Sequence, residues 1–195
     1  MRQARSVEHH TVYCQPGRYA GWPANYGMWC WGRELVVVFA EGTFKHGLSG
    51  HKRDTTQPFT ALQGRSLDGG RTWLAEPFVG PTPRNRAICA DEHMAPDLRI
   101  GDPYTGAHPP VPLARPLDFS DPETVLLVGR TTCESLPNEV HSWFHVSRER
   151  GRRWAGPYRF VGLDEGLLLA GRTDVVRLGP RRALLLLTCH ERDGH

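Results

Sequence analysis

The feature that most constrains this chain is the eight-residue segment SLDGGRTW, which begins at Ser66 and fits the pattern S-x-D-x-G-x-T-W at every defined position. Asp68 precedes two glycines, the second of them Gly70, and can accept backbone N–H bonds inside a turn whose glycines supply positive φ values. Ser66 and Thr72 flank the turn with hydroxyl groups, and Trp73 offers a large apolar surface for packing on a sheet. The segment predicts a β-hairpin and says little about chemistry.

An altered copy of the motif, SRERGRRW, begins at Ser147. Its serine, glycine and tryptophan keep their register, whereas Glu149 replaces the aspartate and Arg153 replaces the threonine. The two copies are further apart than one structural repeat of about 40–50 residues. A proline-rich segment over residues 77–122 accounts for the excess, so we interpret the copies as consecutive repeats separated by a long insertion.

The rest of the chain favours an all-β fold in a single domain over residues 1–195. Short β-rich runs bounded by glycine, proline and aspartate recur along the sequence, and helical periodicity is hard to find. The 21 glycines and 16 prolines suit short strands joined by irregular loops. We expect strands at 35–40, 60–66, 71–75, 124–128, 142–147, 153–154, 174–178 and 183–188.

Composition excludes several classes of function. The longest apolar runs, at 35–40 and 183–187, are far shorter than the roughly 20 residues of a membrane-spanning helix, so we expect no membrane partner. The net charge of +3 is small and its arginines are dispersed, which argues against nucleic acid as a partner. The N-terminal residues MRQARS are not followed by an apolar stretch. We therefore predict a cytoplasmic protein, with secretion left open if the start of the sequence is truncated.

The sequence predicts neither a metal site nor a cofactor. The five cysteines are widely spaced without a C-x-x-C pair, and we expect them to be buried free thiols. The ten histidines include His9, His10, His46, His51 and His93, but none has the i, i+4 spacing of a helical zinc motif with a glutamate between.

The sequence resembles the sialidase superfamily, and more narrowly the bacterial sialidase-like proteins with BNR repeats. Besides the two motifs, the resemblance rests on GWPAN at 21–25 leading into WGRELVVVF at 31–39, on GRRWAGPY at 151–158 and on GRTD at 171–174. Members of this superfamily form six-bladed β-propellers with such motifs, called Asp boxes, between the outer strands of the blades. Six blades of about 50 residues need roughly 300 residues, so the resemblance implies a partial propeller of about two to three blades plus part of the next.

The resemblance also implies site residues. In sialidases, arginines hold the carboxylate of an acid sugar, a tyrosine paired with a glutamate is the nucleophile, and an aspartate is the acid/base catalyst. The first arginine of the family stands two residues before a proline. Here the proline is Pro23 and that position holds Gly21, so the nearest candidate is Arg18. No tyrosine–glutamate pair can be assigned from the sequence.

The candidate for the acid/base catalyst is Asp54, which lies shortly before the first Asp box. A carboxylic acid whose pKa is raised in a closed site can protonate a leaving group, although an aspartate beside Lys52 and Arg53 also fits a solvated loop. Arg172 and Asp174 at the start of a strand are candidate substrate-binding residues, with a structural ion pair as the alternative. Trp22 is a candidate for stacking on a sugar, with core packing as the alternative.

Two functions follow as expectations. The first is a glycoside hydrolase of the exo-α-sialidase type, represented by its N-terminal portion. The second is a non-catalytic propeller that binds a carbohydrate or a protein, because a fold alone does not define an activity. A glycan or glycoside is the expected ligand in both.

Overall fold

The computed structural model describes residues 6–20, 26–47, 52–54, 56–57, 59–82, 89–91, 108–132, 141–163, 167–171 and 174–191. These residues form strands, turns and irregular segments without a helix, which confirms the all-β prediction. Consistent with this, the described part of the chain offers no helix of the length and apolarity that a bilayer crossing requires.

The first sheet is built around one long strand, β3, which pairs with β4 on one edge and with both β1 and β2 on the other. All its pairs are antiparallel, and β5 extends the sheet beyond β4. The strands are β1 (Arg18–Tyr19), β2 (Met28–Trp31), β3 (Glu34–Thr43), β4 (Thr60–Ser66) and β5 (Leu74–Pro77). The order β2-β3-β4-β5 is an antiparallel meander whose last turn is the first Asp box.

The second sheet repeats this meander with β8, β9 and β10, and the second Asp box again forms the last turn. Two short strands pair in parallel at its edges, β6 with β8 and β7 with β10. Its strands are β6 (Cys89–Asp91), β7 (Val111–Pro112), β8 (Val125–Thr132), β9 (His141–Ser147) and β10 (Ala155–Arg159). The predicted insertion thus supplies both edge strands, while its residues 83–88 and 92–107 lie outside the described residues.

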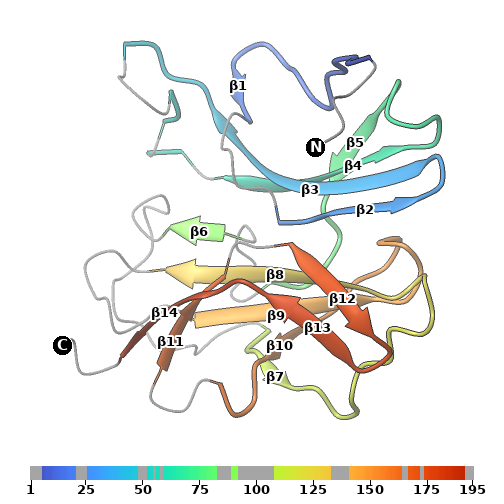
Figure 1. Cartoon of the computed structure of the whole chain (residues 1–195). Coiled ribbons are helices and arrows are strands. Elements are labelled where there is room, and N and C mark those ends of the chain that lie inside the picture. Colours follow the sequence, from blue (N-terminus) through green and yellow to red (C-terminus); the bar gives the residue numbers. More distant parts are fainter. Residues whose placement is uncertain are drawn as a thin grey trace.

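The remaining strands form two antiparallel pairs near the C-terminus, β11 (Leu167–Ala170) with β14 (Thr188–Glu191) and β12 (Val175–Gly179) with β13 (Arg182–Leu185). Figure 1 shows the first sheet above the second, with the hairpin β12–β13 in front of the second sheet.

Two apolar clusters join these layers. One combines Val36 and Val38 of β3 with Leu127 and Trp143 of the second sheet. The other packs the opposite face of the second sheet against the hairpin.

The first Asp box has the hydrogen bonds expected of it. The Asp68 carboxylate accepts the N–H groups of Arg71 (3.0 Å) and Thr72 (2.9 Å) and the Thr72 hydroxyl (2.7 Å). These bonds, the backbone N–H of Thr72 first, hold the pKa of Asp68 well below its usual range. Because the N–H groups of Arg71 and Thr72 bind the Asp68 carboxylate inside the turn, they are not available for strand pairing. The strand β5 therefore begins at Leu74 and not at Arg71 as predicted. Trp73 is half-buried, and its Nε1 donates to the Gly70 carbonyl (2.8 Å).

The second Asp box keeps the serine and glycine geometry of the first. The Ser147 hydroxyl accepts the Gly151 N–H at 2.8 Å, as Ser66 accepts the Gly70 N–H at 2.9 Å. The Glu149 carboxylate, however, forms an ion pair with the side chain of Arg153, 3.7 Å from its Nε. Arg150 has a φ of 52° at the position of Gly69, whose φ is 79°.

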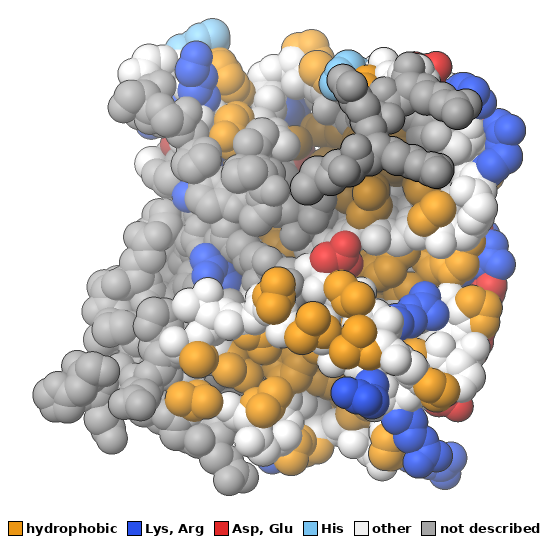
Figure 2. Space-filling model, viewed as in Figure 1, with side chains coloured by type: hydrophobic (Ala, Val, Ile, Leu, Met, Phe, Trp, Pro, Cys, Tyr) orange, Lys and Arg blue, Asp and Glu red, His pale blue; other side chains and the backbone are white. Residues whose placement is uncertain are grey.

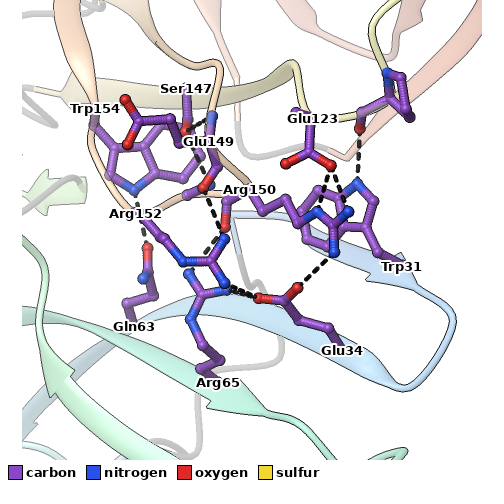
Figure 3. Close-up of polar contacts among 12 residues, drawn as sticks. Trp31, Glu34, Gln63, Arg65, Glu123, Ser147, Glu149, Arg150, Arg152 and Trp154 are labelled. Carbon is purple, nitrogen blue, oxygen red and sulfur yellow. Dashed lines mark hydrogen bonds and ion pairs between the residues drawn. The ribbon is translucent and has the colours of Figure 1, made fainter.

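Two arginines of this altered box, Arg150 and Arg152, bind a carboxylate of the first sheet (Figure 3). Glu34, which is 8% exposed at the start of β3, binds Arg65 of β4, Arg150 (2.9 Å) and Arg152 (3.0 Å). Burial raises the pKa of Glu34, but the arginines, Arg150 first, outweigh it and leave the pKa below its ordinary value. Trp154 adds a bond from its Nε1 to Gln63 Oε1 (2.9 Å). One carboxylate therefore connects two sheets.

Replacing Asp68 by Ala should lower the stability of the fold, because the N–H groups of Arg71 and Thr72 lose their acceptor. The measurement is the urea midpoint of unfolding, with Leu67→Ala on the same turn as the control because Leu67 is 68% exposed. Equal midpoints for the two variants would contradict the role assigned to Asp68.

Replacing Glu34 by Gln should cost about 1.5–3 kcal/mol of unfolding free energy, because the arginines lose a charged acceptor that is itself only 8% exposed. Urea denaturation measures this free energy, and Glu76→Gln on the exposed strand β5 is the matched control. If the two variants lose the same small amount, Glu34 does not join the sheets.

Candidate functional site

Two of the sequence-predicted site residues, Arg18 and Asp54, lie on either side of Thr43 at the end of β3. Arg18 is the register partner of Thr43 in the β1–β3 pair, and its Nη1 donates to the Thr43 hydroxyl (3.3 Å). On the other side, the Asp54 N–H donates to the Thr43 carbonyl (2.8 Å), and a bridge joins Phe44 to Arg53. Thr43 thus lies between the two candidates.

The centre of this region is Glu41, which is only 5% exposed and directly follows the apolar run of residues 35–40 in β3. Its carboxylate accepts bonds from Arg18 Nε and Nη2 (2.6 Å for Nη2), from the Tyr13 hydroxyl (2.7 Å) and from the Thr60 hydroxyl (2.8 Å). The Arg18 guanidinium is the main reason why the pKa of Glu41 falls to about 2. Below, the Thr43 cluster means Tyr13, Arg18, Glu41, Thr43, Lys45, Asp54, Thr56 and Thr60.

Asp54 sits in a small turn of its own at the edge of the cluster. Its Oδ1 accepts the hydroxyl (2.7 Å) and the N–H (3.0 Å) of Thr56 and lies 3.4 Å from Lys45 Nζ. These bonds, that of the Thr56 hydroxyl first, lower the pKa of Asp54. The surroundings therefore favour the carboxylate over the protonated acid, so Asp54 is suited to accept hydrogen bonds from a ligand.

The pair of Tyr13 and Glu41 was missed by sequence reasoning. A tyrosine bonded to a glutamate resembles the nucleophile of sialidases, but burial, and then Glu41, raises the pKa of Tyr13. A carboxylate with a pKa of about 2 is a very weak base for a phenol whose own pKa is raised. The available signal was a glutamate directly after the apolar run of residues 35–40, because such a charge needs a partner when it is buried.

The other candidates lie elsewhere. Asp174 is exposed at the start of β12, on a different layer from the Thr43 cluster, where its Oδ1 accepts the N–H of Val175 (2.8 Å). Trp22 and Arg172 lie outside the described residues. Of the three proposed catalytic and substrate-binding residues that the structure describes, Arg18 and Asp54 lie beside the same residue, Thr43, and Asp174 does not.

A buried histidine was also not predicted from the sequence. His145 of β9 is fully buried with its ring against Phe78 and Trp143, and its Nε2 bonds to the Pro81 carbonyl. Burial lowers the pKa of His145 to about 4, so the ring is neutral at physiological pH. Within the described residues, no three His, Cys, Asp or Glu side chains are grouped as metal ligands. His145 therefore acts in packing between the layers.

Comparison with known proteins adds no relative: no protein-family model and no curated protein matches this chain.

The stability of the fold should depend on pH through Glu41. Its pKa is about 2 in the folded chain against an ordinary value of 4.5, so its contribution is complete above pH 4.5 and is lost as the pH falls towards 2. Glu41→Gln should be less stable at neutral pH and should show a shallower loss of stability in this window. Urea denaturation at several pH values tests this, with Glu76→Gln as the control; parallel curves for Glu41→Gln and the unaltered chain would contradict it.

Proposed function

We propose that this chain forms blades of a sialidase-type β-propeller that acts on glycosides. The observation that carries this proposal is the repeated position of the Asp box. In both large sheets the box forms the turn that ends an antiparallel meander, between β4 and β5 and between β9 and β10. Successive sheets also pack face to face through apolar clusters, as propeller blades do.

Within this proposal the Thr43 cluster is the part of the chain that contacts the sugar. It combines a carboxylate, Asp54, and an ammonium group, Lys45, with the hydroxyls of Thr43 and Thr56 at one end of the first sheet. Such groups suit the hydroxyls of a sugar, which both donate and accept hydrogen bonds. Lys45, with 47% of its side chain exposed, is open to a ligand, while Asp54 at 20% is partly shielded.

A second candidate function, binding without hydrolysis, is favoured by the protonation states of the cluster. Glu41 is too weak a base to activate Tyr13, and Asp54 is held as the carboxylate and not as the acid. General acid catalysis contributes about 10²–10⁴-fold, which is small beside the acceleration that glycosidases achieve. The described residues therefore support recognition of a glycoside better than its cleavage.

The chain should bind sialosides weakly and should release no sialic acid from a fluorogenic sialoside above background. Asp54→Asn should weaken binding by about five- to tenfold, because a charged acceptor is lost. NMR or calorimetric titration with a sialoside measures the affinity. Asp118→Asn is the matched control, since Asp118 makes a similar turn by accepting the N–H of Ser120 (2.8 Å).

The outcomes separate the two candidates. Binding that depends on Asp54 without turnover supports recognition alone. Turnover that disappears in Asp54→Ala supports the hydrolase and contradicts the expected lack of activity. If neither sialosides nor neutral glycosides bind, the Thr43 cluster is not a sugar site.

A further inference from the structure

The hairpin β12–β13 has one covered face and one open face. Val175, Leu185 and Leu187 point inward and pack against the apolar cluster of the second sheet. The alternate residues point outward, and four of them are exposed aliphatic side chains. They are Val176 (54% exposed), Leu178 (55%), Leu184 (45%) and Leu186 (76%). Figure 2 shows hydrophobic side chains gathered over this hairpin.

An apolar pattern on both faces is typical of strands that are covered on both sides. The first sheet illustrates such a covering within this chain. Val37 on its outer face is only 6% exposed, and the ring of Tyr13 from the N-terminal segment packs on Phe39 with centroids 5.6 Å apart. The outer face of β12–β13 has no such cover among the described residues, as the exposure of its side chains shows.

The open face also carries opposite charges at its two ends. Asp174 precedes Val176 and Leu178 with the same alternation, so it lies at the end where β12 begins. Arg182 shares a face with Leu184 and lies beside the turn at the other end. Both residues are exposed. A twofold axis that runs across the strands would place Asp174 of one chain near Arg182 of another, so the face is complementary to itself in charge and in apolarity.

We propose that this face, which consists of Asp174, Val176, Leu178, Arg182, Leu184 and Leu186, is a self-association surface that binds a second copy of the chain with antiparallel hairpins. This inference does not rest on the proposed function. A stable dimer buries roughly 800 Å² on each partner, and a single hairpin face offers less, so the dimer is weak and depends on concentration.

Sedimentation velocity and light scattering test this over a range from low micromolar to near-millimolar protein. The unaltered chain should shift reversibly from monomer to dimer. Leu184→Asp should raise the dissociation constant by at least about tenfold, because it places an unpaired charge in the apolar centre. Leu67→Asp is the matched control, because Leu67 is similarly exposed (68%) on the turn of the first Asp box and should leave association unchanged.

A charge swap tests the geometry of the dimer. Asp174→Arg and Arg182→Asp should each weaken association, and the double variant should restore it because both ion pairs form again in reverse. Circular dichroism shows whether each variant is folded. A monomer at every concentration overturns the proposal and assigns the face to a different partner, such as another sheet. The proposal is also overturned if Leu184→Asp leaves the dissociation constant unchanged. The same holds if the single charge variants weaken association and the double variant does not restore it.

Discussion

Glu34 is the group on which the arrangement of the two large sheets depends. Its carboxylate is nearly buried and binds one arginine from its own sheet and two from the second Asp box. A buried carboxylate is costly unless it is paired, and three guanidinium groups gathered without it would repel one another. The network therefore forms only when both sheets are in place. Apolar contacts between sheets tolerate sliding, whereas this network fixes which turn meets which strand.

The two Asp boxes show how one motif serves two purposes. In the first, Asp68 closes the turn from inside, and the motif stabilises its own hairpin. In the second, the bond between Ser147 and Gly151 still shapes the turn. The side chains of Arg150 and Arg152 extend out of the turn and bind Glu34 in the first sheet. Arg150 accepts a φ that favours glycine, and its contacts with Glu34 and Glu123 (2.6 Å) offset that strain. The side chains of the altered box thus stabilise its interface with the first sheet.

The sequence predicted the local structure better than the site. Alternating apolar residues and turn signals located most central strands, because burial of one face imposes a period of two. The strand β2 (Met28–Trp31) was missed, because aromatic residues and a cysteine gave no clear alternation. Arg18 and Asp54 were named as candidates through a resemblance, but Glu41 and Tyr13 meet only through the tertiary fold, 28 residues apart in the chain. The Glu34 network spans up to 118 residues, and no local pattern encodes it.

Glu34 and Glu41 lie on opposite faces of the same strand. Glu34 binds arginines of the second Asp box, and Glu41 binds Arg18 of the neighbouring strand β1. This has a consequence for ligand recognition. Arg18 already uses Nε and Nη2 for Glu41 and Nη1 for Thr43, so the fork that would bind a ligand carboxylate in two places is occupied. A ligand would have to displace an intramolecular carboxylate whose pKa of about 2 reflects how firmly it is held. Under the proposed function, the groups left to bind a sugar at this end of the first sheet are therefore Asp54, Lys45 and the neighbouring threonines, which suit its hydroxyl groups.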